Sequence, residues 1–161
     1  MDGTMELRQD GTRTGRTEMA EDTLYVEDLT VGDEAPVRSH KLTRTDLVKY
    51  AGASGDYNPM HHDEVAAVAA GQPSVFGHGM FSMGLLGSAL TDYVGVGNVR
   101  RFQVRFAKQT WPDEVLQTRI VVTGTRDEGD EHLVDLEVAL ANADGQEKVV
   151  GVATAVVSAR S

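Results

Sequence analysis

The segment from residue 50 to 63 holds the side chains that are best suited to chemistry. Its sequence, YAGASGDYNPMHHD, places the carboxylate of Asp56 five residues before the imidazole of His61. Asn58 and Pro59 between them favour a turn, which can bring both side chains to one small cavity. A carboxylate and an imidazole that exchanges a proton near neutral pH can together hold and activate a water molecule. We therefore predict a catalytic pair that adds water to, or removes it from, a carbon–carbon double bond.

The same residues also have a purely structural interpretation. Asp56 can close an Asx turn, Asn58 and Pro59 can simply connect two helices, and an isolated histidine is often a hydrogen-bonded packing residue. The run His61-His62-Asp63 suggests a metal site, but adjacent side chains point in different directions and no third ligand has a useful spacing. We expect no metal and no cofactor.

Helices must position this segment. Thr43 and Asp46 form a capping-box-like start to a helix that ends near residues 52–55. A short helix fits residues 63–70. A longer one, from about Met80 to Tyr93, is apolar nearly all round, which predicts that it is buried on most sides.

Strands follow the long helix, because after Gly97 the apolar period changes to two. Turn-forming stretches separate the expected strands, and consecutive strands joined by short turns pair antiparallel. The sequence therefore predicts an α+β domain in which an antiparallel meander wraps around the long helix, the arrangement called the hot-dog fold. The expected strands are 24–26, 35–41, 99–106, 116–123, 133–141 and 149–158.

Two motifs in the chain resemble the MaoC-like, (R)-specific enoyl-CoA hydratase family, also called hydratase type 2. The first motif of the family is an aromatic residue, a few small residues, Gly or Glu, Asp, any residue, Asn-Pro, an aliphatic residue and His. The second is an apolar residue, a small residue and His-Gly-Met at the start of the central helix. The resemblance covers about residues 24–158. The matching residues are Tyr50, Gly55, Asp56, Asn58, Pro59, Met60 and His61 in the first motif, and Phe76, Gly77, His78, Gly79 and Met80 in the second.

The resemblance implies roles for individual residues. Asp56 and His61 would hold the catalytic water, Asn58 would orient the loop, and the backbone amide of Gly79 would face the thioester carbonyl oxygen. Glycine leaves room for a ligand, and an N–H at a helix start can supply about 3 kcal/mol to a developing oxyanion. His78 belongs to the same oxyanion and substrate-binding group. Its place in the family motif fits a supporting role or direct catalysis, and we favour the supporting role.

The chain departs from the family at one position of the central helix. Some members carry a serine there that supports the catalytic aspartate, whereas this sequence has Gly87. Ser82 and Ser88 are the remaining candidates for that support.

Basic residues gather in one place, at Arg100, Arg101, Arg105 and Lys108. They can form a solvated strand face. Alternatively, Arg101 and Arg105 bind substrate by recognising the phosphates of coenzyme A or the acidic surface of acyl carrier protein. Both interpretations remain open.

Composition and charge limit the domain organisation and the classes of partner. The chain has 161 residues, no cysteine, and 15 basic against 25 acidic side chains, a net charge of −10. We expect a flexible tail over residues 1–23 and one domain over 24–158. The acidity disfavours nucleic acid and anionic membranes as partners, and no apolar run is long enough to span a bilayer. With no secretory signal at its N-terminus, the protein is expected to be cytoplasmic.

The leading functional hypothesis is hydration of an enoyl thioester, or the reverse dehydration of a 3-hydroxyacyl thioester, on coenzyme A or acyl carrier protein. By resemblance we expect a homodimer, or a heterodimer with a subunit that lacks the motif. Two other functions fit the same fold: a non-catalytic subunit that binds acyl thioesters, and a hot-dog thioesterase.

Overall fold

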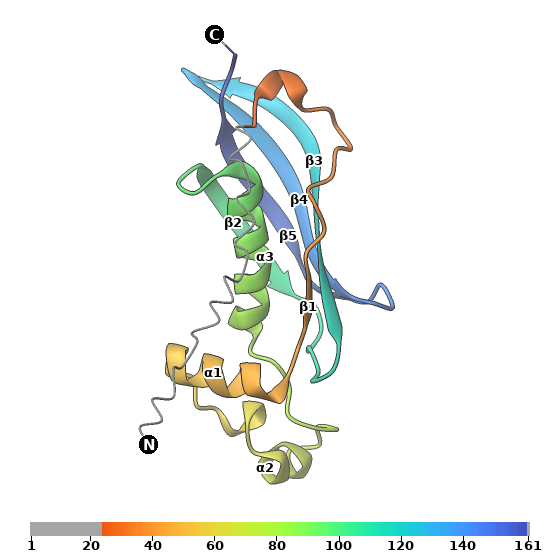
Figure 1. Ribbon diagram of the computed structural model, residues 1–161. Helices are drawn as coiled ribbons and strands as arrows, with labels where there is room; N and C mark the ends of the chain where they lie inside the picture. The colour runs from red at the N-terminus through yellow and green to blue at the C-terminus, as the bar shows by residue number, and fades with distance from the viewer. Residues whose placement is uncertain (1–23, 161) are drawn as a thin grey trace, which may run out of the picture.

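A five-stranded antiparallel sheet packs against one long helix, α3, in a computed structural model that describes residues 24–160 (Figure 1). The helices α1 and α2 lie beyond the N-terminal end of α3 (Figure 1). The strands are β1 (Ser39–Lys41), β2 (Val99–Phe106), β3 (Val115–Glu128), β4 (Glu131–Asn142) and β5 (Glu147–Val157). The helices are α1 (Arg44–Ser54), α2 (Glu64–Ala69) and α3 (Gly79–Val94), with 3₁₀ turns η1 (Val26–Asp28) and η2 (Pro59–His61). This confirms the predicted α+β hot-dog fold.

The strand order β1-β3-β4-β5-β2 differs from a simple meander. Strands β3, β4 and β5 are joined in sequence by tight turns, as expected. Strand β2, however, pairs with β5 and not with its successor β3, so residues 107–114 must cross from one side of the sheet to the other. This crossing segment becomes important for the site.

The core lies between α3 and the inner face of the sheet. Leu86 and Leu90 of α3 are buried, and they belong to one apolar cluster with Leu136 and Val138 of β4. A helix that is apolar on nearly every side buries area against several strands at once, at roughly 25 cal/mol per Å². The prediction that this helix is the centre of the domain is confirmed, although part of its surface, including Met80, stays exposed.

Three strand boundaries were wrong. Residues 24–26 form one isolated bridge, at Tyr25, and then turn into η1. Only residues 39–41 of the expected 35–41 strand form a ladder, because the preceding residues make single hydrogen bonds to β3. Strand β3 continues to Glu128, since the hairpin reverses only at Gly129 and Asp130, where the glycine takes a φ of 61°.

Local capping sets the helices that surround the site. The Thr43 side chain accepts a hydrogen bond from the Asp46 amide, and Asp46 accepts one from the Thr43 amide at 2.8 Å. This is the predicted capping box, which satisfies two amides that the helix itself leaves unpaired. The helix ends at Gly55, whose φ of 75° favours glycine and turns the chain into the loop that carries Asp56.

None of the helices in the described part of the chain is long and apolar enough to cross a membrane. The tail expected over residues 1–23 lies outside the described residues.

Candidate active site

Asp56 and His61 face each other across the loop between α1 and η2. The distance from Asp56 Oδ2 to His61 Nε2 is 3.9 Å. His61 Nδ1 lies 2.7 Å from the carbonyl oxygen of Phe76, and because that oxygen can only accept, Nδ1 carries the proton. In the neutral ring, Nε2 is then a hydrogen-bond acceptor that faces a second acceptor, the carboxylate.

This separation suits one water molecule. Two hydrogen bonds of about 2.8 Å that end on atoms 3.9 Å apart meet at an angle of about 88°, somewhat less than the angle between the two O–H bonds of water. Such a water would donate both protons to the pair and keep its lone pairs free. The pair differs in burial, since the His61 side chain is 9% exposed and that of Asp56 is 51% exposed. The imidazole is thus held in the protein while the carboxylate stays open to solvent.

Asn58 shapes the loop between them. Its amide donates to Asp56 Oδ1 at 3.3 Å, and its own Oδ1 accepts from the Met60 amide at 3.1 Å, which caps η2. Asp56 in turn donates its amide to the hydroxyl of Ser54. These short-range contacts, rather than a serine from α3, surround the aspartate: Ser82 instead lies 3.4 Å from Thr110 Oγ1.

His78 joins the loop that carries Asp56 and His61 to the start of α3. Its ring stacks on that of His61 with the centroids 3.8 Å apart, and its Nε2 donates to the carbonyl oxygen of Asp56 at 3.1 Å. The side chain is buried, and this burial lowers the pKa of His78, so the ring is held neutral. A neutral ring can stack on His61 without adding a positive charge to the site.

Asp56, His61 and His78 also offer one potential metal-ligand atom each, within 4.8 Å of one another. Because His78 Nε2 donates to the carbonyl of Asp56, the lone pair of this ring lies on the buried Nδ1, which has no hydrogen-bond partner among the described residues.

Gly79 lies at the wall of a cavity of about 370 Å³. As the first residue of α3, its N–H has no acceptor within the helix. Asp56 and His61 do not line this cavity themselves, but Phe76 does, and its carbonyl holds His61. The Asp56–His61 pair and the expected oxyanion donor are therefore adjacent through the 76–79 turn. The cavity is lined by Phe76, Gly77, Gly79, Ser82, Phe106, Ala107, Lys108, Gln109, Thr110 and Val149.

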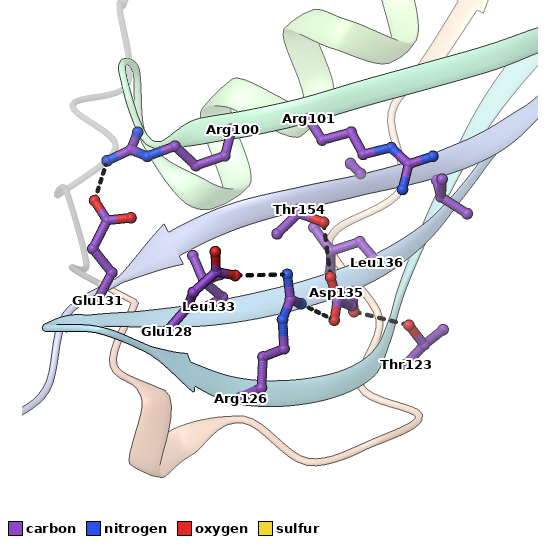
Figure 2. Close-up of a pocket in the computed structure, with 12 residues that line it drawn as sticks. Arg100, Arg101, Thr123, Arg126, Glu128, Glu131, Leu133, Asp135, Leu136 and Thr154 are labelled. Carbon is purple, nitrogen blue, oxygen red and sulfur yellow. Dashed lines mark hydrogen bonds and ion pairs between the residues drawn. The ribbon is translucent and has the colours of Figure 1, made fainter.

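The two arginines expected to bind substrate, Arg101 and Arg105, do not line the cavity beside Gly79. Arg101 borders a separate pocket on the other face of the sheet (Figure 2). Its guanidinium donates to Gln103 Oε1 at 2.6 Å. Arg105 pairs with Val150 in the β2–β5 ladder, and it alternates with Phe106, whose ring contacts the position of Gly79. Only Lys108, from the same basic group, lines the cavity beside Gly79.

The pocket beside Arg101 is largely occupied by compensating charges (Figure 2). Arg126 pairs with both Asp135 and Glu128, and Arg100 pairs with Glu131 at 2.8 Å. The charges of Arg100 and Arg126 are therefore compensated within this face of the sheet, which weakens the pocket as a binding site for anions, whereas Arg101 has the neutral Gln103 as its hydrogen-bond partner.

Several known proteins are similar to this chain in sequence and in fold. The 3-hydroxyacyl-thioester dehydratase Y of Mycobacterium tuberculosis is 38% identical over 82 residues, which make up 48% of this chain and 28% of that protein. The unliganded R-hydratase PhaJ1 from Pseudomonas aeruginosa superposes with a TM-score of 0.69 at 25% identity, covering 83% of this chain and 85% of that one. The ChsH1-ChsH2 complex from Mycobacterium tuberculosis gives a TM-score of 0.67 at 26% identity, with 81% and 98% coverage.

The chain thus spans about a quarter of the dehydratase that it matches. The family model described as the MaoC like domain matches residues 29–143, which include both motifs, the loop that carries Asp56 and the start of α3. Its distant homologues are R-hydratases and 3-hydroxyacyl-thioester dehydratases. With the hot-dog fold and this match together, the chain belongs to the MaoC-like domain family.

Proposed function

We propose that the protein catalyses the (R)-specific hydration of a trans-2-enoyl-CoA, or the reverse dehydration of the 3-hydroxyacyl thioester. The observation that carries the proposal is the facing pair of acceptors, Asp56 Oδ2 and His61 Nε2, with the imidazole fixed by the Phe76 carbonyl. Family membership supports it, because the homologues named above act as R-hydratases and hydroxyacyl-thioester dehydratases.

The chemistry follows from the placement of these groups. Water held by the pair adds its oxygen to C3 of the enoyl thioester as Asp56 takes one of its protons. Negative charge develops on the thioester oxygen, where the Gly79 N–H stabilises it. The pair then delivers one proton to C2, so that it ends with the number of protons with which it began. Dehydration runs through the same steps in reverse.

A hydration assay tests this proposal. The purified protein is mixed with crotonyl-CoA, the loss of the enoyl-thioester absorbance is followed, and the 3-hydroxy product is resolved by chiral chromatography. We expect the (R)-product. Thiol release from a saturated acyl-CoA would instead indicate a thioesterase, and binding without turnover would indicate a non-catalytic acyl-thioester subunit; either result contradicts the proposal.

A second subunit completes the proposal. Strand β2 is an edge strand with one side unpaired in the sheet, and an apolar pocket of about 480 Å³ lies where it meets α3. An unpaired edge beside apolar surface favours association. We expect a homodimer, or a heterodimer with a partner that lacks the motif. The ChsH1-ChsH2 complex, whose fold is similar to that of this chain, is the structure with which such a heterodimer can be compared. Light scattering on the protein alone distinguishes the two, because only the homodimer forms without a partner.

A further inference from the structure

One buried charge has no part in the proposed chemistry. Lys148 of β5 is fully buried, although lysine is among the residues least often found inside a protein. Its Nζ donates to the Glu114 carboxylate at 2.7 Å, to Gln146 Oε1 at 2.9 Å and to the backbone carbonyl of Gln109 at 3.0 Å. An ammonium group has three donors, and all three are used here.

The partner carboxylate is equally committed. Glu114 accepts from the Trp111 amide at 2.8 Å and from the Asn142 side chain at 2.9 Å, besides Lys148. Burial alone would raise the pKa of Glu114, but these hydrogen bonds outweigh it and hold that pKa below its usual value. Glu114 therefore stays ionised, and its contacts with Lys148 and Trp111 fix residues 109–114, which belong to the segment that crosses from β2 to β3.

This crossing segment forms one wall of the cavity and supports the turn that begins α3. Residues 107–110 line the cavity together with Gly79. The Gly77 amide donates to the Thr110 carbonyl at 2.8 Å, and a side-chain carbon at Gly77 would overlap the Thr110 hydroxyl. The turn and the segment are thus in direct contact, with no space between them for independent movement.

We propose that Lys148 is a positioning residue for the reaction. Its ammonium group holds the carbonyl of Gln109. The adjacent Thr110 holds the 76–79 turn through the Gly77 amide, and that turn orients the Gly79 N–H toward the thioester oxygen. This inference rests on the proposed function, and it extends that function to a residue that touches neither substrate nor catalytic water. A lysine with a merely structural role would affect stability alone.

The test replaces both members of the pair by neutral residues of similar size, in the variant Lys148→Met with Glu114→Gln. Removing both charges avoids leaving one of them buried and unpaired, and such replacements are often neutral for stability. We expect kcat for hydration to fall about 10- to 100-fold, with KM changed less than about threefold, because a small displacement of a donor affects the transition state most. Lys148→Met alone is the second variant and should show at least as large a loss.

The exposed pair of Lys41 and Asp113, 3.1 Å apart near the end of the same segment, provides the control. Lys41→Met should leave kcat within about twofold of the unaltered protein. Thermal melting of every variant confirms that it is folded.

Hydrogen exchange by mass spectrometry gives a readout that does not depend on activity. In the double variant we expect faster exchange in peptides that cover residues 76–80 and 107–111, with strand β4 unchanged. A folded double variant with unaltered exchange in residues 76–80, or with unaltered kcat, overturns the inference. If the unaltered protein hydrates no enoyl thioester, the proposed function fails, and the exchange result still decides whether Lys148 positions the turn.

Discussion

Replacing Gly79 by proline removes one N–H group and little else. The residue is the first of α3, where proline is well tolerated because the missing N–H has no partner within the helix. The preceding residue, His78, has φ −60° and ψ 133°, an extended conformation of the kind that proline requires before it. A side-chain carbon at position 79 would lie 3.3 Å from the ring of Phe106, which is half exposed and can shift by the few tenths of an ångström needed.

The magnitude follows from the chemistry of an oxyanion donor. Loss of one such donor typically costs a factor of about 100 to 1,000 in kcat, or roughly 2.7–4 kcal/mol. Gly79→Ala is the matched control, because it adds the same contact with Phe106 but keeps the N–H. We expect Gly79→Pro to reduce kcat for crotonyl-CoA hydration at least about 100-fold relative to Gly79→Ala, with similar melting temperatures. A proline variant within about threefold of the alanine variant would refute the role of this amide.

Three further predictions concern the buried His78, the close packing at Gly151 and the basic residues near the cavity. Burial lowers the pKa of His78. The stability that its neutral ring contributes is therefore present above its unfolded pKa of about 6.5 and is lost as pH falls through the lower folded value. Urea unfolding midpoints measured at several pH values should fall less on acidification in His78→Gln than in the unaltered protein. A side-chain carbon at Gly151 would overlap the backbone of β2. Gly151→Ala should therefore lower the free energy of unfolding in urea by about 1–3 kcal/mol. An unchanged urea midpoint would contradict this packing. If the cavity beside Gly79 binds the thioester, Lys108→Glu should raise KM for crotonyl-CoA more than Arg101→Glu with Arg105→Glu does, and a larger effect of the arginine variants would support phosphate recognition by β2 instead.

The fold could be predicted from the sequence where local signals agreed with tertiary packing. The capping residues Thr43 and Asp46 and the apolar run of α3 identify their helices directly. The strand order could not be predicted, because the alternation in β2 shows which residues face inward but not which strand lies beside it. Its pairing with β5 depends on the close approach at Gly151, a contact between residues about 50 positions apart.

The site shows a similar division. The spacing of Asp56 and His61 predicts that they face each other, since the turn at Asn58 is encoded locally. The carbonyl of Phe76, which fixes the imidazole, could not be foreseen, because a backbone atom leaves no signature in the sequence.

The buried Lys148 gave no signal either. Lysine in a strand is usually a solvated residue. Two of its three acceptors, on Gln109 and Glu114, come from the crossing segment and reach it only after folding, while the third, Gln146, lies two residues before it.

The most direct test of the central claim is the kcat of Asp56→Asn in crotonyl-CoA hydration. Asparagine keeps the size of the side chain but cannot take a proton from the water that the pair is proposed to hold. The account predicts a fall of at least about 100-fold in kcat, with the fold and the binding of substrate retained. A folded Asp56→Asn protein with kcat within tenfold of the unaltered protein would contradict it.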